Sequence, residues 1–213
     1  MNILASTMEL GAHPATALII GGLATVFLRG RLASTVLVIA PILGLWQIHM
    51  LEIGSTSNLA LLGYDIIGVA VDQQAKLFGY LFHLAALVAG IYSFHVRDPW
   101  QISMALFYAA TAVGVAFAGD MLSLFFWWEG LAITSVFQIW GRKTKEAEES
   151  GFRYLFFHVS SGLLLLAGIL FRFHGEGVDA FALTSLTGAL ESGDLGSWLI
   201  LIAIGVKAAF PGL

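Results

Sequence analysis

The stretch that decides the fold is residues 120–141, DMLSLFFWWEGLAITSVFQIWG, in which only Asp120 and Glu129 carry a charge. About 20 apolar residues of helix are needed to cross a ~30 Å hydrocarbon core. Further apolar stretches of this kind lie at 14–28, 33–51, 76–95, 101–119, 151–171 and 196–213. Because no water reaches the backbone inside a bilayer, each stretch must be helical. We therefore predict an all-α, polytopic membrane protein with about seven transmembrane helices.

The composition supports a membrane protein and excludes several functions. Of the 213 residues, 58% are hydrophobic and 11% charged, the net charge is −4, and the mean hydropathy is +0.86. A soluble domain carries roughly a quarter of its residues as charges. The chain has no cysteine, which excludes disulfides, cysteine metal sites and iron–sulfur clusters. It also has no basic block for nucleic acid and no metal-spaced ligand group, so we expect neither nucleic acid nor a metal or other cofactor.

Two connections are long enough to contain structure of their own. Residues 52–75 favour a short extracytoplasmic hairpin on the membrane surface between the second and third helices, and residues 172–195 favour an interfacial helix. We divide the chain into an N-terminal three-helix segment, 1–100, and a segment with helices four to seven, 101–213.

The cations predict the orientation in the cell membrane, because cytoplasmic loops are rich in Lys and Arg. The loops after helices one, three and five hold seven of the ten: Arg29, Arg31, Arg97, Arg142, Lys143, Lys145 and Arg153. The opposite side holds Lys76 and Arg172. We expect the N-terminus outside and the 142–150 loop in the cytoplasm.

Two charges fall where lipid should be. Glu129 lies about 14 Å into the fifth helix and Lys207 about 17 Å into the seventh, counted from the same side. A charge at the bilayer centre costs on the order of 2.5–3.5 kcal/mol or more and by default marks a functional site. We expect the two to form a coupled proton relay, although such a pair can also simply fix helix register. Pro211, four residues after Lys207, should break the seventh helix there.

Two histidines are candidates for extending the relay. His158 lies seven residues into the sixth helix and His83 seven residues into the third, and an imidazole titrates near neutral pH. Each can equally be a hydrogen-bonded packing residue. Their depths differ by roughly 10 Å, which argues against a haem held by both.

Three motifs in order resemble the antiporter-like subunits shared by Mrp-type cation/proton antiporters, respiratory complex I and membrane-bound hydrogenases. They are AGDMLSLFFWWEGL at 118–131, GFRYL at 151–155 followed by SSG at 160–162, and GVK at 205–207. The resemblance is strongest to the D subunit of Mrp antiporters. It implies that Glu129 and Lys207 are the essential glutamate and lysine of the proton pathway.

The resemblance also implies a function and partners. We expect a proton- and Na+-translocating subunit of an Mrp-type antiporter, assembled with other membrane subunits in the bilayer and not catalytic alone. The alternative is the proton-pumping membrane subunit of a complex I-like quinone oxidoreductase or a hydrogenase. Family members have about fourteen helices and a His-x-Trp-Leu-Pro-type sequence after the lysine segment. We therefore expect this chain to be truncated, a fragment, or half of a split subunit.

Overall fold

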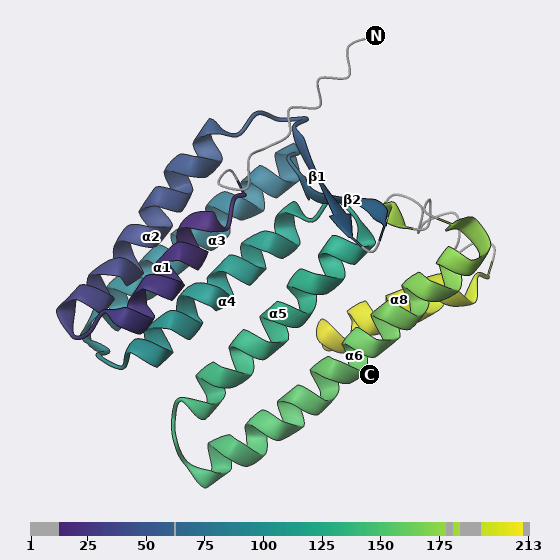
Figure 1. Cartoon of the computed structure of the whole chain (residues 1–213). Helices are drawn as coiled ribbons and strands as arrows, with labels where there is room; N and C mark the ends of the chain where they lie inside the picture. Colours follow the sequence, from purple (N-terminus) through teal and green to yellow (C-terminus); the bar gives the residue numbers. More distant parts are fainter. Residues whose placement is uncertain (1–12, 62, 178–180, 184–192, 211–213) are drawn as a thin grey trace.

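The computed structural model describes residues 13–61, 63–177, 181–183 and 193–210 (Figure 1). The elements follow in the order α1 (Thr16–Phe27), α2 (Arg31–Met50), β1 (Thr56–Leu61), β2 (Tyr64–Ala70), α3 (Gln73–Tyr92), the 3-10 turn η2 (Ser93–His95), α4 (Pro99–Phe117), α5 (Met121–Trp140), α6 (Lys145–Glu176) and α8 (Leu195–Lys207). The predicted all-α membrane architecture is confirmed.

Five of the helices are long and apolar enough to cross a membrane: α2, α3 with its 3-10 turn, α4, α5 and α6. Helices α1 and α8 have 12 and 13 residues. At 1.5 Å per residue they are about 18–20 Å long, which is less than a ~30 Å core. The count of seven membrane spans therefore stays a prediction.

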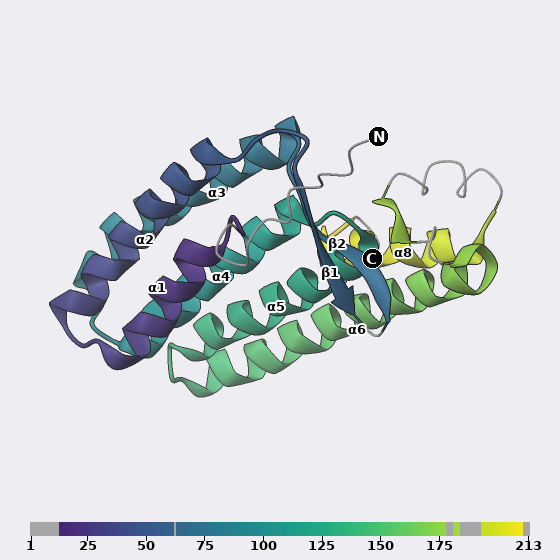
Figure 2. The ribbon, with the colours of Figure 1, turned by 45° about the horizontal axis from the view of Figure 1, so that its top comes forward.

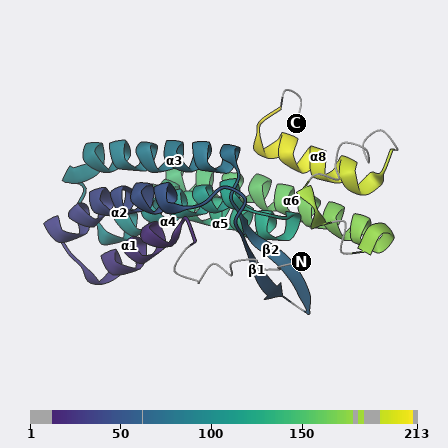
Figure 3. The ribbon, with the colours of Figure 1, turned by 90° about the horizontal axis from the view of Figure 1, so that it is seen from above.

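Helix α4 lies at the centre, packed against α1, α3 and α5, while α6 lies between α5 and α8. The helices run side by side, with the hairpin of β1 and β2 across one end (Figures 1 and 2). Seen from above, the hairpin projects from one face of the layer, and α8 lies on the opposite side, next to α6 (Figure 3). The N-terminal helices share one apolar core that includes Leu18, Ile102 and Phe117, and a smaller one joins α5, α6 and α8 around Leu165 and Ile200.

Close helix contacts depend on glycine, as is common where helices pack in lipid. A Cβ on Gly168 of α6 would lie 2.6 Å from the carbonyl oxygen of Gly196 on α8, and a Cβ on Gly196 would lie 2.7 Å from that of Gly168. Gly90 of α3 lies against Leu37 of α2 in the same way. Helix α8 is thus held against α6 at the level of its backbone.

The antiparallel hairpin lies within the segment for which the sequence favours one, and it is tied to the turn between α4 and α5. The Ile67 N–H donates to Asp120 Oδ2 at 2.6 Å, and the Gly119 N–H donates to the Ile67 carbonyl at 3.2 Å. Asp120 also accepts from the Ser123 N–H at 2.7 Å, which caps α5. The turn at Gly119 and Asp120 is therefore also the anchor of the hairpin. Which side of the membrane it faces stays a prediction.

The start of α6 differs from the prediction. Residues 142–150 are expected to form a solvated loop, but α6 begins at Lys145 and runs for 32 residues. The Thr144 hydroxyl accepts from the Ala147 N–H at 3.2 Å, and Glu146 and Glu148 lie in the first turn. A side-chain cap and early acidic residues stabilise a helix N-terminus, so the helix extends beyond the apolar stretch. In the segment 172–195, the first residues belong to α6, and most of the others lie outside the described residues.

Candidate functional site

Glu129 lies in the middle of α5 and faces α6. A Cβ added at Gly162 of α6 would collide with Glu129 Oε1, so the missing side chain of this glycine makes room for the carboxyl group. Glu129 Oε1 is buried and has no hydrogen-bond partner among the described residues. Buried polar groups in native proteins almost always have partners, and an exception needs an explanation such as a catalytic role or a bound water or ion.

Lys207 is the last residue of α8, and the way in which α8 ends positions it. The Phe210 N–H donates to the Gly205 carbonyl at 2.9 Å and the Ala209 N–H donates to the Val206 carbonyl at 3.2 Å. Ala209 has a φ of 53°. This is a Schellman motif, with alanine where glycine is usual. The ammonium group lies near the negative end of the helix dipole, which favours a cation.

The structure brings Lys207 to α5 beside Glu129. Lys207 Nζ donates to the Trp128 carbonyl at 2.7 Å and lies 4.2 Å from the centroid of a Trp128 ring. Lys207 and Glu129 interact electrostatically, but the ion pairs of the described residues do not include a direct one between them. The amine therefore binds the residue next to the glutamate, and the carboxyl group remains without a donor.

His158 lies one helical turn before Gly162 on α6. Together with Trp128, Glu129 and Lys207 it belongs to a cluster of side chains from α5, α6 and α8. Its Nδ1 lies 3.1 Å from the Tyr154 carbonyl, and its ring stacks on the Tyr154 ring at 3.8 Å. A carbonyl can only accept, so we assign the proton to Nδ1, which leaves a lone pair on Nε2. His158 also interacts electrostatically with Lys207.

Two members of this cluster are not identified by the sequence reasoning. The hydroxyl groups of Tyr154 on α6 and Ser135 on α5 are 2.7 Å apart. The spacing of four residues between Tyr154 and His158 places them on one face of a helix, which is a usable signal. No pattern in α5 alone pairs Ser135 with that face.

His83 lies elsewhere. It is fully buried between α2 and α3, against Gly44, and its Nδ1 lies 2.9 Å from the Gly79 carbonyl. The structure does not bring it to the cluster of α5, α6 and α8. Pro211, the predicted helix break, lies outside the described residues, although α8 does end at Lys207. Among the described residues, no group of three or more His, Cys, Asp or Glu side chains could hold a metal ion.

The chain is similar to known proteins in its sequence and in its fold. The family model described as NADH:quinone oxidoreductase/Mrp antiporter, TM, matches residues 118–213. A solved structure of the membrane-bound sulfane sulfur reductase, an archaeal respiratory membrane complex, matches with a TM-score of 0.79 and 18% identity over 93% of this chain and 34% of that one. At this identity the likeness shows the fold.

The chain spans about a third of the length of that relative. No curated protein matches the chain. The family match covers the segment that contains both Glu129 and Lys207, and three helices of the fold, α5, α6 and α8, hold these residues together. Residues 118–213, just under half of the chain, are thus similar to the membrane subunits of NADH:quinone oxidoreductase and of Mrp antiporters.

Proposed function

We propose that the chain translocates protons and Na+ as a subunit of an Mrp-type cation/proton antiporter, with Glu129 and Lys207 as its coupled relay. One observation carries this proposal. In the middle of a membrane helix, a buried carboxyl oxygen without a partner lies next to the carbonyl that binds the ammonium group of Lys207. Other membrane subunits and the bilayer are the proposed partners, with the N-terminus outside and residues 142–150 in the cytoplasm.

The geometry supports a switch between two positions of the amine. In one position the Lys207 ammonium group binds the carbonyl of Trp128, and in the other we propose that it binds the carboxylate of the next residue, Glu129. Near the carboxylate, the ammonium group stabilises the negative charge and favours proton release from Glu129. When the amine returns to the carbonyl, the carboxyl group is in an apolar environment without a donor and favours proton uptake.

His158 offers a second acceptor for a proton from Lys207. The proton on Lys207 Nζ would pass to the lone pair of His158 Nε2, which leaves a neutral amine and an imidazolium. The basis for this branch is the nearness of the two residues, which is reflected in the electrostatic repulsion between their protonated forms. Among the residues that the structure describes, His83 has no lysine neighbour of this kind, and we propose for it the packing role.

The test is Glu129→Gln in the assembled complex, reconstituted in proteoliposomes. The amide keeps the size of the side chain but cannot exchange a proton, so we expect normal assembly and loss of Na+-driven proton flux, followed with a pH-sensitive dye. Glu148→Gln, on the exposed first turn of α6, is the matched control and should keep its flux. Unchanged flux in Glu129→Gln would refute the relay.

The alternative is the proton-pumping subunit of a complex I-like quinone oxidoreductase or a hydrogenase. The family description names a quinone oxidoreductase beside the antiporter, and the similar solved structure comes from a respiratory complex. The same proteoliposomes distinguish the two functions. Flux that needs a Na+ gradient supports the antiporter, whereas flux that needs electron transfer and ignores Na+ supports the alternative.

A further inference from the structure

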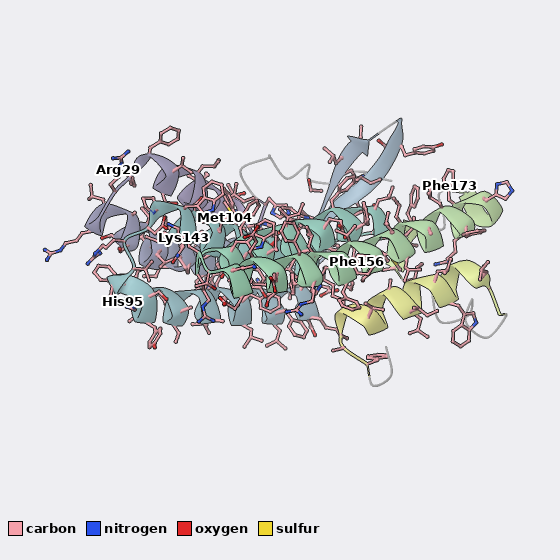
Figure 4. All side chains as sticks on the ribbon, turned by 90° about the horizontal axis from the view of Figure 1, so that it is seen from below. Arg29, His95, Met104, Lys143, Phe156 and Phe173 are labelled. Atoms are coloured by element: carbon pink, nitrogen blue, oxygen red, sulfur yellow. The ribbon has the colours of Figure 1, made fainter. Side chains whose placement is uncertain are left out.

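A surface pocket at the other end of the helices from the hairpin has no role in the proposed relay. Its walls come from the turn after α1 and from the connection between α3 and α4. The lining residues are Val26, Arg29, Arg97, Asp98, Pro99 and Trp100. Figure 4 labels Arg29 at this end of the molecule, together with Lys143.

Two guanidinium groups from distant parts of the sequence line this pocket. Arg97 Nη1 donates to Ser34 Oγ at 2.7 Å, and its guanidinium lies 5.7 Å from the centroid of the Phe94 ring. The buried Ser34 in turn donates to the Val96 carbonyl at 2.9 Å, so the connection between α3 and α4 is tied to the first turn of α2. Arg29 is exposed, and among the described residues it has no hydrogen bond or ion pair.

The one carboxylate of the pocket is already engaged. Asp98 Oδ1 accepts from the Trp100 N–H at 3.0 Å, which caps α4, and Asp98 Oδ2 pairs with Lys143 Nζ at 3.3 Å. The charges of Arg29 and Arg97 are therefore not compensated within the pocket. A net positive pocket of this kind attracts an anion, and the planar guanidinium group matches the geometry of a phosphate.

The pocket is continuous with an apolar surface. Val26 and Trp100 are 50% and 51% exposed, and Leu23, one turn earlier on α1, is 53% exposed. The Trp100 ring is held edge-on against Phe137, with 5.6 Å between the ring centroids. Tryptophan is enriched at the membrane interface, where its ring lies at the level of the headgroups. A free phosphate would use only the arginines, whereas a lipid would use both parts of the surface.

We propose that this pocket binds an anionic phospholipid, with Arg29 and Arg97 on the headgroup phosphate and the acyl chains along Val26, Leu23 and Trp100. Basic pockets between membrane helices bind anionic headgroups in this way. The bound lipid would join the α1 turn to the start of α4 at the membrane surface.

Native mass spectrometry of the full chain, with dioleoyl phosphatidylglycerol and dioleoyl phosphatidylcholine added at equal concentration, tests the proposal. We expect the chain to retain phosphatidylglycerol preferentially. Each arginine should contribute about fivefold to that preference. Arg29→Gln should therefore weaken it about fivefold, and Arg29→Gln with Arg97→Gln should weaken it further. The single variant removes a side chain without a partner, so it should fold normally.

Arg153→Gln, which removes an exposed arginine of α6 outside the pocket, is the matched control and should bind as the unchanged chain does. The lysine variant Arg29→Lys should keep part of the preference, because the charge remains and the bidentate geometry is lost. The proposal is overturned if Arg29→Gln binds as the unchanged chain does, or if Arg153→Gln loses as much. It is also overturned if glycerol 3-phosphate at equal concentration displaces the lipid, since the site would then recognise a soluble phosphate.

Discussion

The helices α1 to α4 and the helices α5, α6 and α8 differ in how their buried polar groups are hydrogen-bonded. Between α1 and α4, the hydroxyls of Thr25 and Ser103 both donate to the Gly22 carbonyl at 2.8 Å, and both residues are fully buried. Between α5, α6 and α8, Glu129 Oε1 and Trp128 Nε1 are buried and have no partner in the part of the chain that the structure describes. Half of the α4 span is buried, compared with 22% of the α5 span.

This difference separates a structural region from a candidate functional one. Satisfied hydroxyls and extensive burial make α1 to α4 a packed support, with the Nε2 atom of His83 as an exception. Unsatisfied polar groups beside an ammonium group are costly, and they are expected where a group must exchange a proton. Substitutions in α1 to α4 should therefore change the thermal stability, whereas substitutions in α5, α6 and α8 should change the proton flux.

Among the substitutions that test this difference, Gly162→Ala should have the largest effect on proton flux. The new methyl group would occupy the place of Glu129 Oε1 and force the carboxyl group to move. Misplacement of a reacting group by about 1 Å can cost on the order of 10²-fold in rate. We expect a loss of this size in Na+-driven proton flux, together with a shifted carboxyl C=O band in the infrared spectrum.

The control is Gly175→Ala. Gly175 lies on α6, as Gly162 does, but a Cβ added there would have no atom of another part of the chain within 4 Å among the described residues. It should leave the flux and the infrared band unchanged. Normal flux in Gly162→Ala would show that the position of the Glu129 carboxyl group against α6 does not matter for transport.

A smaller effect, of a different kind, should follow Gly90→Ala in the structural region. The added Cβ would lie 2.6 Å from the carbonyl oxygen of Leu37, so α2 and α3 must separate. Overpacking of this kind costs roughly 1–3 kcal/mol. We expect a lower Tm with unchanged flux per folded molecule, whereas Gly68→Ala, where the nearest atom is 3.6 Å away, should keep its Tm. A lost flux at normal Tm would remove the distinction between the two regions.

The smallest effect concerns His13, which joins the two regions just before α1. Its ring lies 4.9 Å from a Trp127 ring of α5, and its Nδ1 accepts from the Ala15 N–H at 3.1 Å. Burial lowers the pKa of His13 to about 4 from the ordinary value of 6.5. Between these values the unfolded chain binds more protons than the folded chain, so stability should fall as the pH falls from 6.5 to 4.

Thermal unfolding of the detergent-solubilised chain, followed by tryptophan fluorescence at pH 7 and pH 4.5, measures this dependence. We expect a fall in Tm of roughly 2–4 °C for each kcal/mol lost. His13→Gln should reduce the dependence, whereas His174→Gln, at an exposed position of α6, should not. An equal pH dependence in His13→Gln would show that the burial of the His13 imidazole is not its cause.

Much of the fold follows from the order of the residues. Apolar stretches of about 20 residues require helices in lipid, whatever their neighbours are. The positions of Glu129 and Lys207 within two such stretches likewise predict that both are buried at similar depth. By contrast, the start of α6 depends on the Thr144 cap, a local hydrogen bond that hydropathy does not register.

The sequence by itself determined the membrane class, most of the helices and the two charges within them, because these depend on length and composition along one segment. Only the tertiary structure decided which groups meet: Lys207 on the Trp128 carbonyl, Glu129 against Gly162, and His83 between α2 and α3. The depth of a residue is set by its place along its own helix. Its partner is set by how each helix is rotated and how closely the backbones approach, and these depend on side chains from all the neighbouring helices at once.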